Sequence, residues 1–251
     1  MKGFSVHQHS LLRAPTGLIC CSQIKHPSTH NPRINNWLRV QVFLKSYQGA
    51  LELLESSQEF SALKRFLETL PAPVWSGKSA TPGLSVIPQA LNALISEYFI
   101  AHDWIAQPMV TEDTQFYADF YKYANSRQLL CEVQLGNAAR FDSDLIKFQI
   151  GKAENRCDVA LEIVPMRNTA KRMNINTANF ERAEKTLDSM EPILARAELP
   201  ILLVGFDMDD EILPVDGQFP NKAYKQVSVV EKVEAALRLY AQSKASVFAD
   251  K

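Results

Sequence analysis

Residues 199–206, with the sequence LPILLVGF, constrain the fold of this chain more than any other stretch. The segment is a continuous apolar run of strand length, without the alternation of polar and apolar residues that a half-exposed strand shows. Such a run is typical of a strand covered on both faces, which requires helices on each side of its sheet. We therefore expect an α/β protein with a buried sheet at its centre.

The remaining patterns place strands and helices around this segment. Residues 1–35 show no clear period and are expected to form an irregular leader or an edge strand. Alternating apolar residues predict a strand at 38–44, and helical spacing predicts one broken helix or two over 50–70. The order as a whole predicts a mixed central β-sheet flanked by helices. The further elements expected are helices at 87–103, 138–153, 176–198 (interrupted near Pro192) and 228–248, a strand at 157–166 and a loop at 70–83.

Length and charge set broad limits on organisation and location. The chain has 251 residues and no shift in composition that would mark a linker, so we expect a single domain over 1–251. A formal net charge of −1 gives no global basic field, which is only a weak argument against a nucleic-acid partner. Neither a signal-peptide pattern nor a long apolar stretch is present, which predicts a cytoplasmic protein without a membrane partner.

The four cysteines do not indicate a disulfide framework or a thiolate zinc site, since none of them forms a CxxC spacing. Cys131 and Cys157 fall within strand patterns and are expected to pack as small hydrophobic residues.

Two acidic residues are expected to face each other across a β-hairpin. The segments QFYADFYKY and QLLCEVQL flank ANSR, and a two-residue turn at Asn125 and Ser126 suits this spacing because Asn tolerates positive φ. Counting outward from that turn places Asp119 opposite Glu132. Gln134, two residues further along, shares their face of the strand.

The closeness of these carboxylates has two interpretations. Like charges that are directly opposed across a ladder are destabilising, so one carboxyl must take up a proton or a cation must lie between them. Mg²⁺ binds oxygen ligands and retains several waters, and such a water can attack a phosphodiester. The other interpretation is that Asp119 and Glu132 decorate a solvated edge, and their spacing alone leaves both open.

Three motifs in the same order resemble a known family. The tetrapeptide from Asp119 to Lys122 (DFYK), the tripeptide from Glu132 to Gln134 (EVQ) and the strand CDVALEIVPM are similar to the catalytic core of type II restriction endonucleases of the BglII and BstYI kind. That group has the PD-(D/E)xK nuclease fold, with EVQ in place of the commoner Glu-x-Lys. The resemblance covers about residues 85–206 and implies a restriction-endonuclease-like core with a catalytic β-hairpin.

The resemblance also implies roles for individual residues. Asp119 and Glu132 would hold Mg²⁺, Gln134 would be the third catalytic position, and Asn92 on the preceding helix would help to hold the attacking water. A solvated helix residue is an equally good interpretation of Asn92. The separation of 13 positions from Asp119 to Glu132 is longer than this family usually shows, but an even extension through the hairpin tip leaves both on one face. The DNA contacts that the resemblance implies are Asn137, Lys147, Asn174, Asn176 and Thr177.

Of these contacts, Asn137 and Lys147 have specific chemistry. An Asn at position 137 suits bidentate pairing with adenine in the major groove. Lys147 could reach a phosphate, although an ordinary solvated lysine is the alternative.

Other polar groups have weaker functional interpretations. Asp158 and Glu162 share one face of a strand and could form a second metal pair, although a hydrogen-bonded or interface role is the preferred interpretation of Glu162. DMDDE at 207–211 lacks the glycine of a calcium loop and is expected to be a solvated turn. His7 and His9 have a spacing that could bind a metal, but no further ligand is near them in the sequence. A basic group could contact phosphates or form a charged helix face: Arg167, Lys171, Arg172, Arg182 and Lys185.

The function that the resemblance implies is that of a Mg²⁺-dependent type II restriction endonuclease. It would cleave double-stranded DNA at a short palindromic site, for which a sequence with a central GATC is the first candidate. A homodimer is expected, because two-fold protein symmetry would mirror that of the site. A cognate DNA methyltransferase is expected in the same system. The alternatives are a catalytically silent DNA-binding protein of the same fold and a nonspecific or repair nuclease.

Overall fold

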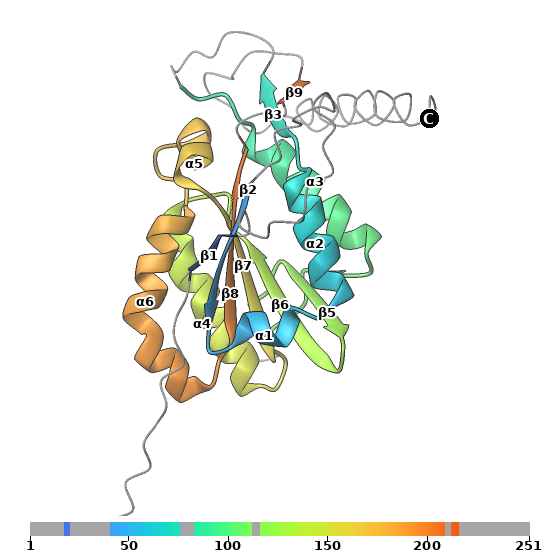
Figure 1. The fold of residues 1–251 in the computed structure, drawn as a ribbon, viewed down its shortest axis with the longest axis vertical. Coiled ribbons are helices and arrows are strands. Elements are labelled where there is room, and N and C mark those ends of the chain that lie inside the picture. The colour runs from blue at the N-terminus through green and yellow to red at the C-terminus, as the bar shows by residue number, and fades with distance from the viewer. Residues whose placement is uncertain (1–17, 21–40, 76–82, 112–115, 209–211, 216–251) are drawn as a thin grey trace, which may run out of the picture.

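The computed structural model describes residues 18–20, 41–75, 83–111, 116–208 and 212–215 of the chain. At its centre lies a seven-stranded sheet in the order β1-β2-β8-β7-β6-β5-β4 (Figure 1). The strands of this sheet are β1 (Leu18–Cys20), β2 (Gln41–Tyr47), β4 (Ile105–Ala106), β5 (Phe120–Ala124), β6 (Arg127–Val133), β7 (Val159–Pro165) and β8 (Ile201–Asp207).

The sheet is mixed, as the sequence predicts. Strands β6, β7 and β8 are parallel, and the pairs β1–β2, β2–β8, β4–β5 and β5–β6 are antiparallel. The carboxyl ends of the three parallel strands therefore meet at one edge of the sheet, where the loops that follow them come together. In open α/β sheets, ligands bind in the crevice outside such ends.

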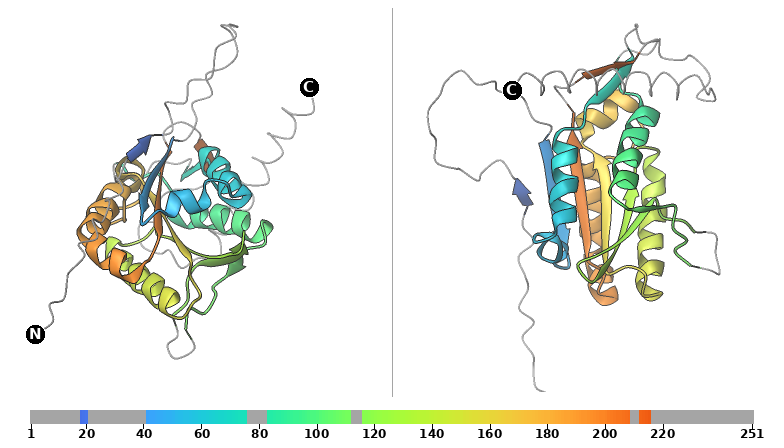
Figure 2. Two further views of the ribbon diagram at one scale, coloured as in Figure 1. Left: turned by 60° about the horizontal axis from the view of Figure 1, so that its bottom comes forward. Right: turned by 90° about the vertical axis from the view of Figure 1, so that its right-hand side faces the viewer.

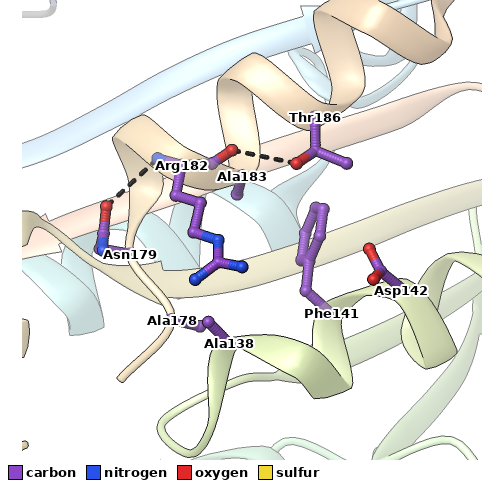
Figure 3. A pocket seen from close by; sticks show the side chains of 8 residues that line it. All are labelled: Ala138, Phe141, Asp142, Ala178, Asn179, Arg182, Ala183 and Thr186. Carbon is purple, nitrogen blue, oxygen red and sulfur yellow. Dashed lines mark hydrogen bonds between the residues drawn. The ribbon is translucent and has the colours of Figure 1, made fainter. Parts of the chain in front are cut away.

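Helices α4 (Phe141–Ala153) and α6 (Phe180–Ala197) cover one face of the sheet. Leu145 and Phe148 from α4 and Leu187 from α6 are buried against strand residues such as Leu130. Phe141 from α4 borders a small hollow between the two helices, together with side chains of α6 (Figure 3). This layer matters for function because it covers the face that carries even-numbered residues of β6 and β7.

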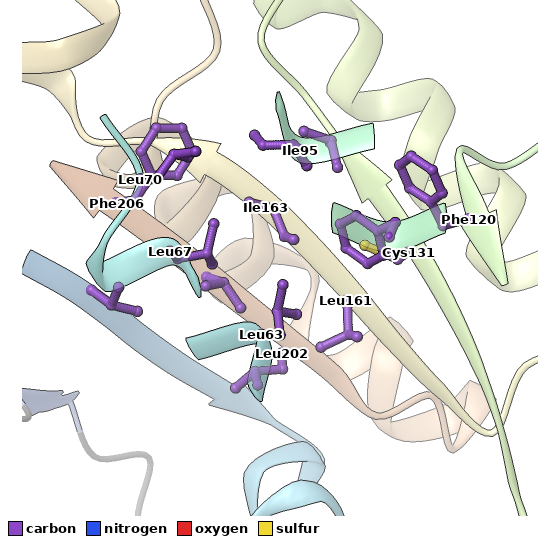
Figure 4. Close-up of a cluster of buried hydrophobic side chains, with 14 of the residues drawn as sticks. Leu63, Leu67, Leu70, Ile95, Phe120, Cys131, Leu161, Ile163, Leu202 and Phe206 are labelled. Atoms are coloured by element: carbon purple, nitrogen blue, oxygen red, sulfur yellow. The ribbon is translucent and has the colours of Figure 1, made fainter. Parts of the chain in front are cut away.

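Helices α1 (Ala50–Leu54), α2 (Gln58–Glu68) and α3 (Pro88–Ala101) cover the opposite face. Their buried side chains pack on the other residues of the same strands, among them Cys131, Leu161 and Leu202 (Figure 4). Phe99 of α3 stacks on Phe120 with ring centroids 4.3 Å apart. Figure 2 shows the helices on both sides of the sheet from two further directions. The sheet is thus buried between two helical layers, as the run at 199–206 predicts.

A short helix and a small second sheet lie at the end where β8 finishes (Figure 1). Helix α5 (Arg167–Met173) is tied to that end because Thr169 Oγ1 donates to the Asp207 carboxylate at 2.7 Å and accepts from the Met208 N–H at 2.9 Å. Strands β3 (Ala72–Trp75) and β9 (Ile212–Val215) pair in parallel.

Most of the elements predicted from the sequence are confirmed, and two expectations are wrong. The region 70–83 is not all loop, because residues 72–75 form β3 although Pro73 lies among them. The helix over 176–198 is not interrupted, since α6 continues through Pro192 while Leu187 and Leu194 on either side stay buried. Helix α5 and strands β4 and β9 are not predicted at all. The helix expected at 228–248, the pair His7 and His9, and residues 209–211 of DMDDE lie outside the described residues.

Within the described residues, no helix is long and apolar enough to cross a membrane.

Candidate active site

The β5–β6 hairpin has the turn and register that the sequence predicts. Asn125 and Ser126 have φ angles of 51° and 60°, in the left-handed region that a two-residue hairpin turn requires. The ladder runs from Ala124 opposite Arg127 to Phe120 opposite Cys131. The next residue on each strand is Asp119 and Glu132, so the hairpin brings these two acidic residues to the same place.

Asp119 is held by hydrogen bonds at the point where the ladder ends. Its Oδ2 accepts from the backbone N–H of Val133 at 2.8 Å, and its backbone carbonyl accepts from the N–H of Gln107 at 2.9 Å. A carboxylate that accepts from the main chain is fixed in direction. Asp119 therefore presents its second oxygen from a defined position beside the end of β6.

Glu132 and Glu162 lie side by side on neighbouring parallel strands. The register pairs Glu132 with Glu162, and both point to the face covered by α4 and α6. Glu132 is 2% exposed, so the interpretation that it decorates a solvated edge is wrong. Glu162 is completely buried, and both of its carboxyl oxygens lack a hydrogen-bond partner within the described part of the chain.

Helix α4 adds a carboxylate and a lysine to this group. The Nζ of Lys147 lies 2.9 Å from Glu132 Oε1 and 2.9 Å from Asp144 Oδ1, so the ammonium bridges a strand residue and a helix residue. The Lys147 side chain is 16% exposed, so it is not an ordinary solvated lysine. We define Asp119, Glu132, Asp144, Lys147 and Glu162 as the acidic cluster.

Gln134 is bound at both ends of its amide. Its Nε2 donates to Asp144 Oδ2 at 2.8 Å, and its Oε1 accepts from the N–H of Gly136 at 3.0 Å. The side chain is buried. It therefore connects Asp144 to the loop after β6.

The electrostatics of the acidic cluster follow from burial and from an excess of negative charge. Burial raises the pKa of Glu132 to about 9, Asp119 and Asp144 push it in the same direction, and Lys147 opposes them. Burial and the neighbouring carboxylates raise the pKa of Glu162 well above its ordinary value. Burial lowers the pKa of Lys147, but its bonds to Glu132 and Asp144 outweigh this, and the net pKa is raised. One ammonium among several carboxylates leaves the cluster short of positive charge.

The donor atoms of the acidic cluster suit a hard divalent cation. Carboxylate oxygens are the ligands that Mg²⁺ prefers, and the two unpartnered oxygens of Glu162 beside Glu132 mark a place where positive charge is missing. In the described residues no three His, Cys, Asp or Glu side chains are arranged as ligands of one ion. The Lys147 ammonium lies between Glu132 and Asp144.

Four of the five residues expected to contact DNA line one hollow of about 330 Å³. Gly136 N–H links this hollow to the acidic cluster through Gln134. Two further backbone hydrogen bonds, between Ala138 N–H and Asn176 O and between Ala178 N–H and Gly136 O, join its two loops. The four residues are Asn137, Asn174, Asn176 and Thr177.

The individual positions in the hollow differ in what they can offer to a ligand. Asn137 is exposed, but its Oδ1 already accepts from the N–H of Ala139 and caps a short 3₁₀ helix (Ala138–Arg140). Asn174 Oδ1 accepts from the N–H of Asn176. Thr177 is buried and bridged to Asn137 through the backbone.

Asn92 is exposed on α3. It follows Gln89, a residue that lines the hollow, by three positions, so the two lie on the same side of the helix. Among the described residues, Asn92 neither lines the hollow nor joins the hydrogen bonds of the acidic cluster.

Two of the weaker candidates have structural roles. Asp158 Oδ2 accepts from the N–H of Gln128 at 2.8 Å, which directs it to the start of β6 and away from Glu162 in the middle of β7. Arg172 Nη1 donates to the Met208 carbonyl at 2.7 Å and its Nε to Ser85 Oγ at 3.3 Å, so it ties α5 to the segments around it.

A comparison with protein families agrees with this geometry. The family model described as "Restriction endonuclease BglII/BglIII" matches residues 42–206, which include every member of the acidic cluster. The chain belongs to the restriction endonuclease BglII/BglIII family. It is therefore a type II site-specific deoxyribonuclease by family.

A solved structure of BglII with DNA supports the same fold for this BglII/BglIII family member. A crystal structure of restriction endonuclease BglII complexed with a DNA 16-mer matches with a TM-score of 0.60 and 22% sequence identity, over 73% of this chain and 85% of that chain. A crystal structure of free BglII matches with a TM-score of 0.48 and 17% identity, over 75% of this chain and 88% of that chain. No curated protein matches the sequence.

Sequence reasoning missed one member of the acidic cluster. Asp144 is buried on the face of α4 that also carries Phe141 and Phe148, although a carboxylate is rarely buried without a partner. A charged residue in an otherwise apolar helical stripe, with a lysine three positions later, was the available signal.

Proposed function

We propose that this BglII/BglIII family member is a Mg²⁺-dependent endonuclease that cleaves double-stranded DNA at a short palindromic site. The observation that carries the proposal is the acidic cluster at the carboxyl end of β6 and beside the middle of β7, in which one ammonium faces several carboxylates. A protein tolerates such an excess of buried negative charge when a cation compensates it. The nuclease would be a single domain over 1–251.

Asp119 and Glu132 are the residues that would hold the cation. When bound there, Mg²⁺ would supply a water of lowered pKa and a positive charge close to the scissile phosphodiester. Asp119 is oriented for this task by the N–H of Val133. Gln134 keeps Asp144 in place through its amide and does not itself act as a base. Asn92 would help to orient the attacking water from α3.

The hollow beside the acidic cluster would receive the DNA. Asn137, Asn174 and Asn176 border it and carry amides that can hydrogen-bond base edges. Because Oδ1 of Asn137 already caps a helix, its free Nδ2 donor is the group expected to read a base acceptor. Thr177 would hold the loop through its backbone bridge. Lys147, the one cationic member of the acidic cluster, would contact a phosphate of the DNA.

The partners follow from the symmetry of the proposed substrate. A homodimer would present two copies of the acidic cluster to the two strands of a palindrome. A sequence with a central GATC is the first site to examine. A cognate DNA methyltransferase would protect the host DNA, and the protein would act in the cytoplasm.

Digestion of unmethylated plasmid DNA in the presence of Mg²⁺ tests this proposal against its alternatives. Discrete fragments with uniform ends support a restriction endonuclease, and end-mapping then gives the recognised site. A smear of products favours a nonspecific or repair nuclease. Intact plasmid together with a retarded band in a binding gel favours a catalytically silent DNA-binding protein.

The substitution Glu132→Ala separates cleavage from binding. We expect it to abolish cleavage, since it removes a proposed cation ligand, and to leave the retarded band in place. A fully active Glu132→Ala variant would remove Glu132 from the mechanism. Glu154→Ala, an exposed glutamate just after α4, is the matched control and is expected to cleave as wild type does.

A further inference from the structure

The third position of the EVQ motif lacks the positive charge that the commoner Glu-x-Lys pattern carries. Gln134 is neutral, buried and bound at both ends, to Asp144 and to the N–H of Gly136. It has no charge to offer a phosphate, and turning its amide toward a substrate would break two hydrogen bonds. A strand lysine is thus absent from a centre that must bind a polyanion.

A lysine nevertheless reaches this centre from another element. Lys147 starts on α4, and its Nζ lies 2.9 Å from the proposed cation ligand Glu132 and 2.9 Å from Asp144. Asp144 is in turn held by Gln134 at 2.8 Å. The motif glutamine and the helix lysine are therefore joined through one carboxylate.

We propose that Lys147 supplies, from α4, the ammonium group that the motif strand lacks. This inference rests on the proposed function. In the DNA-free protein the ammonium neutralises Glu132 and Asp144 and fixes the Glu132 carboxylate at the end of β6. When a divalent cation takes Glu132, the bond to Asp144 keeps the ammonium in the cluster.

The charge at this place has a function during cleavage. Negative charge develops on the phosphoryl oxygens as a phosphodiester is attacked, and a fixed cation in a buried site stabilises that charge more than it stabilises the ground state. Lys147 is the only ammonium that the hydrogen bonds of the described residues bring to Glu132. Its loss should therefore lower kcat more than it changes the binding of DNA.

The cation that binds Glu132 and the ammonium compete for the same carboxylate. A lysine whose ammonium did not hold the Glu132 carboxylate would, on removal, weaken the binding of a divalent ion or leave it unchanged. A lysine that occupies Glu132 in the metal-free protein would, on removal, strengthen it. This difference gives a measurement that does not depend on cleavage.

The experiment compares Lys147→Met with wild type in the full chain. We expect kcat to fall about 100-fold, as for the loss of one preorganised charge-stabilising group, with KM for DNA changed less than about threefold. We expect the dissociation constant for Mn²⁺, measured without DNA from the free-ion electron paramagnetic resonance signal, to decrease by about three- to tenfold. Lys152→Met, near the C-terminal end of α4, is the matched control and should change neither kcat nor the dissociation constant for Mn²⁺.

A second variant moves the ammonium from α4 to position 134, just after β6. If the two positions serve the same purpose, the double variant Gln134→Lys/Lys147→Met should have a kcat at least about tenfold higher than that of Lys147→Met alone. A folded double variant without recovery counts against the inference. If the double variant does not fold, the single variant decides.

The inference is overturned if Lys147→Met cleaves within about threefold of wild type, or if its Mn²⁺ affinity is equal or weaker. A wild-type protein that cleaves no DNA would overturn the proposed function instead. In that event the Mn²⁺ titration still decides whether Lys147 occupies Glu132.

Discussion

The side chain of Asp119 accepts a hydrogen bond from the backbone N–H of Val133, with 2.8 Å between Oδ2 and the nitrogen. This bond takes the place of the next rung of the hairpin, because the ladder ends at Phe120 and Cys131. One oxygen of this carboxylate thus completes the sheet, and we propose that the other binds a cation. The two tasks can be separated by substitution.

Asp119→Asn should keep the fold and lose the chemistry. Its amide oxygen can still accept from Val133, so we expect a change of less than about 1 kcal/mol in the free energy of unfolding, together with loss of cleavage. Asp119→Ala leaves the Val133 N–H without that acceptor and should cost about 1–3 kcal/mol more. Urea unfolding and plasmid cleavage measure the two effects. Equal stability of Asp119→Asn and Asp119→Ala would show that the hydrogen bond to Val133 contributes nothing to the free energy of unfolding.

Asn137 also combines a structural and a proposed recognition role. Asn137→Asp keeps an oxygen that can cap the N–H of Ala139 but replaces the Nδ2 donor with an acceptor. We expect Asn137→Asp to have the same urea midpoint of unfolding as wild type. We expect the free energy of unfolding of Asn137→Ala to fall by about 1 kcal/mol, because its helix cap is lost.

Both Asn137 variants should change site preference, which cleavage of a randomised site library measures. An unaltered preference in Asn137→Asp would exclude a base contact by Nδ2. Because the Asn137→Asp variant is expected to keep the cap on Ala139 and hence the stability of wild type, a change in its site preference cannot be explained by unfolding.

Glu162 should destabilise the metal-free protein. Its carboxyl is completely buried without a hydrogen-bond partner among the described residues, and burial raises its pKa well above the ordinary value. We expect Glu162→Met, a substitution of similar length, to raise the free energy of unfolding by about 1–3 kcal/mol in urea without divalent ions. Glu154→Met on the surface should change it by less than about 0.5 kcal/mol. A Glu162→Met variant that is less stable than wild type would reveal a partner for this carboxyl.

Cys157 should be unreactive in the native protein. Burial raises the pKa of its thiol to about 12, and burial raises that of Cys131 as well. Because the thiolate is the reactive form, a raised pKa removes reactivity at neutral pH, and it returns only as pH rises toward the folded-state value. In a Cys20→Ser/Cys21→Ser protein at pH 8, a thiol reagent should modify neither cysteine until urea unfolds the chain. Rapid modification without urea would show that β6 and β7 open readily.

Local sequence signals determined the β5–β6 hairpin, which carries the proposed catalytic residues Asp119 and Glu132. The turn at Asn125 and Ser126 fixes the register, and a fixed register with a period of two places Asp119 and Glu132 together. The apolar run at 199–206 likewise determined a buried strand, because a strand without polar residues has no face to offer to water. These features depend on neighbours within about ten residues, so the sequence shows them directly.

Only the tertiary structure decided which side chains complete the site. Lys147 reaches Glu132, and Asp144 reaches Gln134, because α4 packs on the even-numbered face of β6. No periodicity within α4 reports the depth or rotation with which the helix lies on the sheet. The pairing of β3 with β9 is another example. Both are short proline-containing segments far apart in the sequence, and no local pattern in either one predicts that it pairs with the other. Secondary structure follows from short-range periodicity, whereas contacts between distant segments are set by how whole elements pack, and the chemistry of this centre depends on those contacts.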